Sequence, residues 1–274
     1  MNCNKGGRMS GTVSEAILEM NENLDKYTEY VKILKERCNK EKLNDFSKLR
    51  GFSEELIDKQ DIFWIGDMSE MLVPDFLNDL RSFGVISETN GMPIFHDRWI
   101  MPIKDDNGKV LNLVGYTNKS DERYVYGTGT YYDRTDTLYG LENWHKAYKD
   151  GWCIITEGIT DTLSIRNIGY ENCFAMCGTR PSDYKMKLLN RLRYGVIFIH
   201  DRDRAGDKTR KHWIVNRYMR FNTPLQYKDA DETLHDENQD NVAWFKECMN
   251  MAINWVKSEE HHGKKCVCEE NTMV

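Results

Sequence analysis

Residues 153–161 read Cys-Ile-Ile-Thr-Glu-Gly-Ile-Thr-Asp. The apolar run that opens this stretch predicts a short buried strand, and residues 160–168 predict a helix directly after it. Glu157 stands where the strand ends, and Asp161 follows in the first helical turn, so both carboxylates point toward the same end. Gly158 has no Cβ, which lets the backbone turn tightly and a ligand approach closely. The stretch therefore predicts a strand–helix unit with acids at the carboxyl end of its strand.

The same alternation continues along the chain. Further strands are expected at 173–176, 196–199 and 224–227, with helices at 182–193 and 205–219. Short apolar strands that alternate with helices predict βαβ units, and hence an α/β fold with a mostly parallel sheet flanked by helices. Because ligands gather at the carboxyl ends of the strands in such sheets, a functional site is expected at that edge.

Two more acidic clusters each follow a predicted strand. They are His-Asp-Arg-Asp-Arg-Ala-Gly at 200–206 and Lys-Asp-Ala-Asp-Glu at 228–232. Two acids in each cluster are two residues apart, so both project to one side of an extended segment. These acids are Asp201, Asp203, Asp229 and Asp231. Together with the first cluster, they place six carboxylates at one end of the predicted sheet.

Carboxylates gathered in this way repel one another. At ~4 Å and an effective dielectric near 20, one like-charged pair costs about 4 kcal/mol, so such a site calls for a divalent cation. Oxygen-only ligands favour Mg²⁺ or Mn²⁺ over zinc, and they indicate chemistry on phosphate. The alternative is that the acids are N-caps and first-turn residues, which favour helix starts. That alternative explains any one cluster equally well, but it does not explain three clusters that each follow a strand.

The residues before 151 have a different pattern. Helices are expected within 13–42, from Ser53 and over 73–83, followed by a strand at 99–103, a turn at 105–108 and a strand at 110–116. A Gly- and Tyr-rich loop is expected at 124–136 and a helix at 138–148. After the parallel sheet, residues 241–257 predict one amphipathic helix.

This pattern divides the chain into four parts. They are a helical extension at 1–40, an α+β subdomain at 41–150 that is expected to supply basic contacts, a metal-binding domain at 151–235, and a C-terminal helix and tail at 236–274. Hydrophobic residues make up 40% of the chain and charged residues 30%, which is typical of a globular protein. No apolar run approaches the ~18 residues of a membrane span, and the N-terminus lacks a secretory h-region. Eight cysteines without a regular framework indicate reduced thiols, so a cytoplasmic protein with no membrane partner is expected.

The order of these motifs resembles a known family. Glu-Gly-x-x-Asp, Asp-x-Asp-Arg-Ala-Gly and Lys-Asp-x-Asp-Glu, in this order, resemble the TOPRIM domain of bacterial and phage DnaG-type primases. Upstream matches to the primase core are found at 49–53, 97–105, 107–110 and 137–141, and a further match is found at 177–179. The resemblance covers about residues 40–235, which is the whole catalytic core of that family.

The resemblance implies a template-directed RNA polymerase that makes short primers on single-stranded DNA from ribonucleoside triphosphates during DNA replication. It implies that Mg²⁺ ions, or Mn²⁺, are held by the TOPRIM carboxylates. Glu157 is the first choice for an essential catalytic carboxylate, and Asp201 and Asp203 follow as catalytic metal ligands. Asp161, Asp229 and Asp231 complete the metal site.

The family also uses basic residues of the preceding subdomain to hold template and triphosphate. The matching positions are Arg50, Arg98, Arg123 and Arg134, with Lys104 as a weaker neighbour. A guanidinium can bind phosphate in bidentate fashion, although a single surface Arg is otherwise most often just solvated.

The sequence departs from the family pattern at four positions. Arg123 and Arg134 stand where lysines are usual, Tyr116 stands where the family has an Arg, and Tyr126 lies near a usual Asn. Tyr124, Tyr126, Tyr131 and Tyr132 could stack on bases or equally pack against the sheet.

Two features of the family have no counterpart in these 274 residues. The Cys/His spacing of the N-terminal zinc ribbon is absent, and His261, His262, Cys266 and Cys268 are spaced too tightly to form one. Only about forty residues follow position 235, where the family has a large helicase-binding domain. The net charge of −6 also counts against a tight autonomous DNA binder, although it does not exclude local basic patches. A minimal, phage-encoded core in a bacterial host cell is expected, with a replicative helicase as a possible partner.

Two other functions are open on the sequence alone. One is a TOPRIM nuclease or topoisomerase-like cleavage domain, which would require an ATPase domain or a nucleophilic Tyr elsewhere. The other is a non-catalytic replication adaptor that keeps the fold and binds DNA or a helicase. The upstream matches favour primase over the nuclease, and the full set of six acids favours it over the adaptor.

Overall fold

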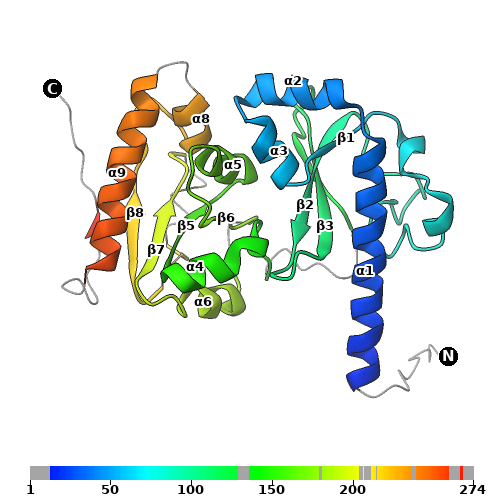
Figure 1. Ribbon diagram of the computed structural model, residues 1–274, viewed down its shortest axis with the longest axis horizontal. Coiled ribbons are helices and arrows are strands. Elements are labelled where there is room, and N and C mark those ends of the chain that lie inside the picture. The colour runs from blue at the N-terminus through cyan, green and yellow to red at the C-terminus, as the bar shows by residue number, and fades with distance from the viewer. Residues whose placement is uncertain are drawn as a thin grey trace, which may run out of the picture.

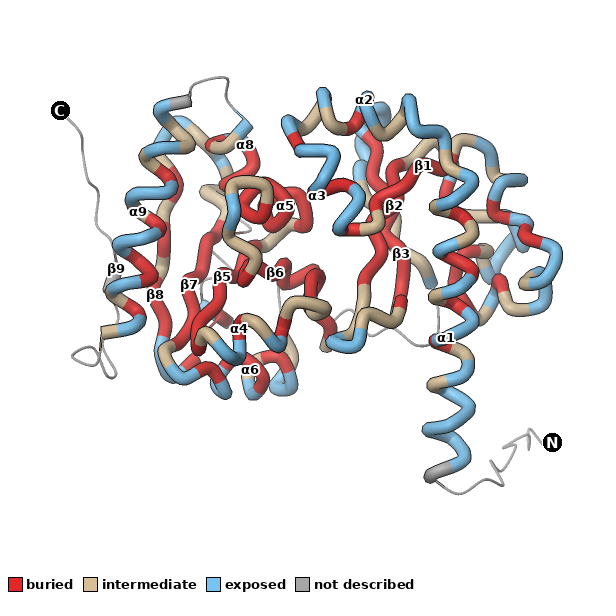
Figure 2. Tube along the Cα trace, viewed as in Figure 1, coloured by how far each residue is buried: buried red, intermediate tan, exposed pale blue. Residues whose placement is uncertain are grey.

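The chain forms two lobes that lie side by side, each built on its own sheet (Figure 1). The computed structural model describes residues 13–128, 136–178, 181–203, 206, 211–213, 215–235, 239–258 and 266–267. Burial is concentrated in the strands and in the helix faces turned toward them (Figure 2). Among the described helices, none is long and apolar enough to cross a membrane.

The N-terminal lobe is an antiparallel sheet with helices on it. Its helices are α1 (Val13–Arg37), α2 (Lys40–Arg50) and α3 (Glu54–Lys59), and its strands are β1 (Phe63–Ile65), β2 (Arg98–Lys104), β3 (Val110–Tyr116) and β4 (Tyr124–Tyr126). The strand order is β1-β2-β3-β4. Helix α1 packs through Tyr27 and Tyr30 against Phe83, and the Tyr27 and Phe83 rings stack with their centroids 4.5 Å apart.

The C-terminal lobe contains a five-stranded parallel sheet in the order β6-β5-β7-β8-β9. Its strands are β5 (Trp152–Thr156), β6 (Cys173–Ala175), β7 (Gly195–Ile199), β8 (Tyr218–Phe221) and β9 (Cys266–Val267). Its helices are α4 (Trp144–Asp150), α5 (Ile159–Asn167), α6 (Asp183–Leu189), α8 (Ala230–His235) and α9 (Gln239–Lys257). The α/β class and the parallel sheet flanked by helices are therefore confirmed.

Alternate residues of β5 pack on opposite faces of this sheet, as the period of a strand requires. Cys153 and Ile155 belong to a cluster with Leu188 of α6. Trp152 and Ile154 belong to a second cluster with Phe245 of α9. Because helices cover both faces, every residue of β5 is buried, and the strand is apolar without alternation.

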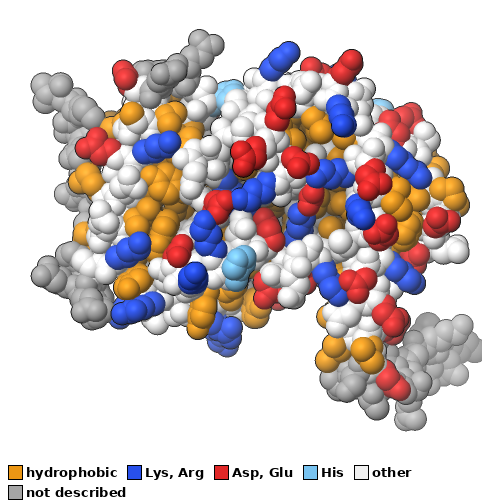
Figure 3. All heavy atoms as spheres, in the orientation of Figure 1, with side chains coloured by type: hydrophobic (Ala, Val, Ile, Leu, Met, Phe, Trp, Pro, Cys, Tyr) orange, Lys and Arg blue, Asp and Glu red, His pale blue; other side chains and the backbone are white. Residues whose placement is uncertain are grey.

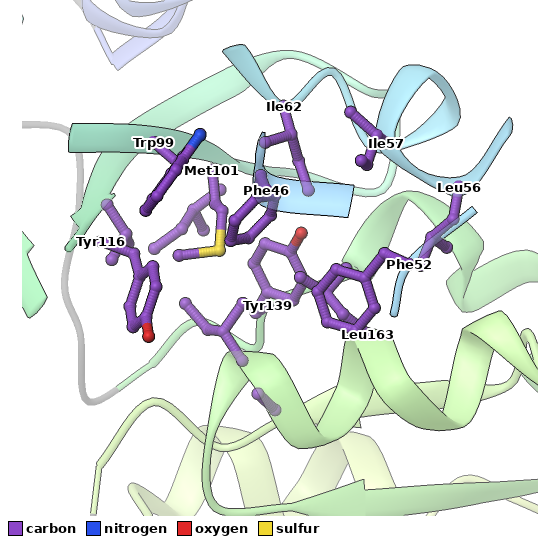
Figure 4. Packing of buried hydrophobic residues seen from close by; sticks show 14 of the residues in the cluster. Phe46, Phe52, Leu56, Ile57, Ile62, Trp99, Met101, Tyr116, Tyr139 and Leu163 are labelled. Atoms are coloured by element: carbon purple, nitrogen blue, oxygen red, sulfur yellow. The ribbon is translucent and has the colours of Figure 1, made fainter. Parts of the chain in front are cut away.

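A third apolar cluster joins the two lobes (Figure 4). Phe46 of α2 and Trp99 of β2 lie with ring centroids 5.0 Å apart, and the cluster continues to Leu163 of α5. Beside it, Arg166 of α5 has a side chain that is only 2% exposed. Its guanidinium donates to Oε1 of Gln60 at 2.6 Å and to the carbonyl oxygens of Gly140 and Cys173 at 3.0 Å. The lobes are thus held together by buried apolar and polar contacts.

Three expectations about local structure are corrected. Within 73–83, only Pro74–Phe76 forms a helix, a 3₁₀ turn, and successive turns then carry Leu80 and Phe83 into the core against α1. Tertiary packing here outweighs an apparent helical period.

Residues 124–126 of the expected loop form β4, while 129–135 lie outside the described residues.

The last predicted strand is also misplaced. Residues 224–227 form a turn, closed by a hydrogen bond from Tyr227 N to Pro224 O at 3.1 Å, and the strand is Tyr218–Phe221. Proline has no N–H to give to a β-ladder, which disfavours the predicted position. The strand also overlaps the end of the helix expected at 205–219, and several residues of that helix lie outside those described.

Candidate functional site

Glu157 and Asp201 meet at the carboxyl ends of two neighbouring parallel strands. Glu157 follows β5 directly, and Asp201 lies two residues after β7. The backbone N–H of Asp201 donates to Oε1 of Glu157 at 3.1 Å, and Nδ1 of His200 lies 3.6 Å from the same oxygen. The Glu157 side chain is 14% exposed, so its carboxylate is held in place at the sheet edge.

Position 206 requires a glycine, because the backbone there passes close to Asp201 and Glu157. A Cβ at that position would lie 2.0 Å from the carbonyl oxygen of Asp201 and 3.1 Å from Oε1 of Glu157. The N–H of Gly206 donates to Oδ1 of Asp203 at 2.8 Å. The glycine of the Asp-x-Asp-Arg-Ala-Gly motif therefore lets the backbone fold back against both acidic residues.

Asp161 and Asp231 connect α5 with α8. Asp161 is buried in the first turn of α5, and its Oδ1 accepts the N–H of Asp231 at 3.0 Å. Oδ1 of Asp231 accepts the hydroxyl of Ser164, and its Oδ2 accepts Nη1 of Arg50 at 2.6 Å. Both carboxylates thus accept hydrogen bonds that link α5 and α8, and Asp231 also links α8 to α2.

The other three carboxylates converge on one ammonium group. Nζ of Lys228 lies 3.2 Å from Oδ2 of Asp201, 3.5 Å from Oδ2 of Asp203 and 3.8 Å from Oδ2 of Asp229. The backbone of Lys228 is fixed as well, because its carbonyl accepts the N–H of Arg202 at 2.7 Å. The loop after β8 is therefore docked on the loop after β7.

Burial and mutual repulsion shift the proton affinities of these acids. Burial, with the Glu157 charge added, raises the pKa of Asp201 to about 6. Burial also raises the pKa of Asp229 and, with the charges of Asp229 and Asp201, the pKa of Asp161. For Lys228, burial alone would lower the pKa, but the surrounding carboxylates outweigh burial and raise it. Strongly shifted groups gathered in one place are typical of functional sites.

The donor set suits a hard divalent cation in kind. All the acids offer oxygen atoms, which Mg²⁺ and Mn²⁺ prefer. The Oδ2 atoms of Asp201, Asp203 and Asp229 lie within 3.2 to 3.8 Å of the Lys228 ammonium. Within the described residues, no three His, Cys, Asp or Glu side chains are yet close enough to hold a metal ion. The carboxylates would have to close around a cation from positions now spaced by the Lys228 ammonium.

The expected basic residues do not all lie beside the acidic edge. Arg123 is exposed and directly precedes β4, where the Tyr124 hydroxyl lies 3.0 Å from Oγ1 of Thr160 on α5. That contact places the start of β4 beside the acidic edge. Arg98 donates from Nη1 to the carbonyl oxygens of Glu122 and Arg123, both at 3.1 Å, and so fixes the segment that carries Arg123.

Arg50 and Lys104 are engaged in ion pairs. Arg50 pairs with Asp231, and its guanidinium lies 4.6 Å from the centroid of the Tyr116 ring. Lys104 pairs with Asp61 at the opposite end of β2 from Arg98. Lys104 lies six positions beyond Arg98 along the strand, which is about 20 Å. Lys104 is therefore the one expected residue among those described that the fold carries away from the acidic edge.

Of the four tyrosines considered for base stacking, two lie within the described residues and two lie outside them. Tyr124 and Tyr126 are partly buried against the cluster between the lobes, and the Tyr124 and Tyr116 ring centroids are 5.1 Å apart. Arg134, Tyr131 and Tyr132 lie outside the described residues, as do His261, His262 and Cys268 and the side chain of Cys266. On the face of the protein that Figure 3 shows, acidic and basic side chains are interleaved rather than segregated.

The sequence pattern does not single out Lys228, and it favours His200 as a strand-end residue over a metal ligand or an acid. Both belong to the quoted motifs, where Lys228 directly precedes Asp229 and His200 directly precedes Asp201. Their adjacency to the acids was a usable signal, because a cation beside several carboxylates stabilises their ionised forms.

Comparison with known proteins supports the resemblance. Residues 154–234 match the family described as Toprim-like. A DNA primase of Thermotoga maritima is 26% identical over 242 residues, which cover 80% of this chain and 43% of that protein. The chain thus spans less than half the length of this curated relative.

Two solved structures share the fold. The DnaG primase catalytic domain bound to single-stranded DNA has a TM-score of 0.70 at 18% identity, covering 87% of this chain and 83% of that one. The zinc-binding and RNA polymerase domains of the Aquifex aeolicus primase give 0.68 at 23% identity, covering 92% and 63%. The fold is that of a DnaG catalytic core, and the resemblance to DnaG-type primases with a TOPRIM domain is confirmed.

Proposed function

We propose that this chain, with its DnaG-type core fold and primase relatives, carries out Mg²⁺- or Mn²⁺-dependent synthesis of short RNA primers on single-stranded DNA. The observation that carries the proposal is the convergence of Asp201, Asp203 and Asp229 on one cationic centre. It lies at the carboxyl ends of parallel strands, where ligands of such sheets bind. The expected division into a core subdomain at 41–150 and a metal-binding domain at 151–235 is part of this proposal.

In this function, Asp201, Asp203 and Asp229 hold the cation. A bound divalent cation would offset the charge of the triphosphate and of the oxygens that attack and leave. Glu157, fixed by the Asp201 N–H and by His200, places its carboxylate at the edge where these oxygens would lie. Asp161 and Asp231 support the site from the α5–α8 contact.

The N-terminal lobe would hold the nucleic acid. Arg123 is exposed beside the acidic edge, and Arg98 braces the backbone that carries it. A guanidinium there can bind a phosphate of the template or of the nucleotide. Arg50 acts through Asp231 rather than on phosphate, and Lys104 lies too far away to take part. Arg134 keeps its expected role as a phosphate contact.

The partners follow from the chemistry. Single-stranded DNA is the template and ribonucleoside triphosphates are the substrates, and one structural neighbour was solved with single-stranded DNA bound. A replicative helicase is a further candidate partner, and the bacterial cytoplasm is the expected place of action.

The test is primer synthesis on mixed-sequence single-stranded DNA with labelled ribonucleotides and Mg²⁺ or Mn²⁺. The active-site variant is Asp201→Ala/Asp203→Ala. Its matched control is Glu29→Ala/Glu36→Ala, which removes the same charge from exposed positions of α1. Short RNA products from the wild-type protein and the control, but not from the active-site variant, are the expected result.

Other outcomes would contradict the proposal in distinct ways. Metal-dependent nicking of the DNA without RNA synthesis would indicate the TOPRIM nuclease. Binding of DNA or of a helicase with neither product, also after addition of a zinc-binding primase domain, would indicate the non-catalytic adaptor.

A further inference from the structure

Lys228 occupies the position between the three carboxylates that the proposed function assigns to a divalent cation. Its Nζ approaches an oxygen of Asp201, Asp203 and Asp229 within 3.2 to 3.8 Å. An ammonium has three N–H donors and a full positive charge, so it is attracted to all three carboxylates. The contacts come from two different loops, so this side chain joins the segment after β7 to the segment after β8.

The backbone of Lys228 holds the side chain in register with the acids. The Lys228 N–H donates to Oε2 of Glu232 at 2.8 Å, and the Lys228 carbonyl accepts the N–H of Arg202 at 2.7 Å. The base of the side chain is thereby anchored on both sides. Only its four-carbon stem decides where the charge lies.

The surroundings allow that stem to move. The Lys228 side chain is 47% exposed, whereas those of Asp201, Asp203 and Asp229 are 19%, 38% and 17% exposed. The lysine is therefore the most exposed member of the cluster. A flexible lysine stem can swing a compact, strongly hydrated charge from such a position into water.

The ammonium and a divalent ion compete for the same oxygens. Their own repulsion at ~4 Å is twice that of two unit charges, so binding of one disfavours the other. With the ammonium among these carboxylates, no three of the described His, Cys, Asp or Glu side chains form a metal site. Without any cation, the acids would repel one another.

We propose that Lys228 is a resident counter-cation that holds Asp201, Asp203 and Asp229 together in the metal-free protein and is displaced when a divalent ion binds. It lowers the affinity of the site for metal, since each binding event must break its three contacts. It also protects the fold from the repulsion of the acids. The inference rests on the proposed function for the metal site alone, and not on primer synthesis.

The test measures Mn²⁺ binding by calorimetry in the absence of DNA and nucleotide. Lys228→Met removes the charge and keeps the length of the side chain, Lys228→Arg keeps the charge, and Lys187→Met is a control at an exposed position of α6. Lys228→Met should bind Mn²⁺ about tenfold more tightly, because one competing unit charge is worth at least that factor. The two other variants should stay close to the wild-type affinity.

A thermal melt gives a second, independent readout. In chelator, Lys228→Met should melt below the wild-type protein, and Mn²⁺ should raise its melting temperature by more than it raises that of the wild type. Lys228→Gln repeats both measurements with a polar neutral side chain, in case the methionine variant does not fold.

The outcomes separate the two proposals. If the wild type binds Mn²⁺ and the neutral variants bind it equally or more weakly, Lys228 is not a competitor, while the metal site stands. If only the neutral variants bind, the competition is confirmed in its strongest form. If none of these proteins binds Mn²⁺, both the metal site and the role of Lys228 are wrong.

Discussion

Arg50, the last residue of α2, donates from Nη1 to Oδ2 of Asp231 in the first turn of α8 at 2.6 Å. The two residues are 181 positions apart, and their side chains are only 15% and 10% exposed. Arg50 also contacts the Tyr116 hydroxyl. The Asp231 carboxylate accepts a hydrogen bond from the Ser164 hydroxyl, and the Asp231 N–H donates to the Asp161 carboxylate. One ion pair therefore connects the N-terminal lobe to the helix starts on which the acidic edge depends.

Arg50→Ala should destabilise the protein by about 3 kcal/mol, because it leaves the Asp231 carboxylate buried without its cation. Urea unfolding measures the change. The control is Lys42→Ala in the same helix, whose partner Asp45 is exposed, so its loss should stay below about 1 kcal/mol. Equal losses for the two variants would mean that the Arg50–Asp231 pair does not hold the lobes together.

Glu157→Gln should reduce primer synthesis by roughly 100-fold or more, because it removes a fixed negative charge at the reacting edge. The fold should be retained, since the amide oxygen can still accept the Asp201 N–H. Circular dichroism and melting temperature serve as controls for folding. Primer synthesis at the wild-type rate would exclude Glu157 as a catalytic residue.

Arg123→Ala should weaken binding to single-stranded DNA and flatten its dependence on salt. The loss of one phosphate contact lowers the slope of log K against log salt by about 0.7. Fluorescence anisotropy over a salt series measures it, with Arg191→Ala as a control on an exposed residue before β7, at the other end of the parallel sheet. The same slope in Arg123→Ala and wild type would remove Arg123 from the phosphate contacts.

Glu171 gives a test at acid pH. Hydrogen bonds from Lys146 and Lys59 lower its pKa to about 2, so its ionised form is favoured in the folded state. The stability that it contributes is therefore present above its ordinary pKa of 4.5 and is lost as the pH falls toward 2. Because these pairs are at the surface, the contribution should be below about 1 kcal/mol.

The measurement compares the unfolding free energies of wild type and Glu171→Gln near about pH 7 and about pH 3. The difference should shrink at the lower pH. Glu88→Gln, an exposed position in a turn, should show no difference at either pH. A Glu171→Gln difference that grows on acidification has the wrong sign for this assignment.

Gly206→Ala should disturb the acidic edge, because its Cβ would lie 2.0 Å from the Asp201 carbonyl oxygen. Overpacking of this kind costs about 1–3 kcal/mol, and it should also weaken Mn²⁺ binding by moving Asp201. Gly178→Ala is the control, since its Cβ would meet nothing within 4 Å. Unchanged stability and Mn²⁺ affinity in Gly206→Ala would show that this loop has another conformation in solution.

Local pattern was sufficient for the elements whose side chains follow one simple period. The buried runs of β5 and β7 and the hairpin of β2 and β3 could be placed from apolar spacing and from the Asn107-Gly108 turn. It failed at 73–83 and at β8, where packing against α1 and the missing N–H of Pro224 decided the structure. A period in the sequence cannot report contacts with distant residues.

By itself, the sequence determined the α/β class and the parallel strands β5, β6 and β7, and it predicted six acids at their carboxyl edge. These depend on short-range pattern and on the rule that parallel strands end together. Only the tertiary structure decided the contacts of each acid within that set. It bound Asp231 to Arg50, buried Asp161 between α5 and α8, and turned Asp201, Asp203 and Asp229 toward Lys228. It also carried Lys104 away from the site, because charges interact through distance in space and not along the chain.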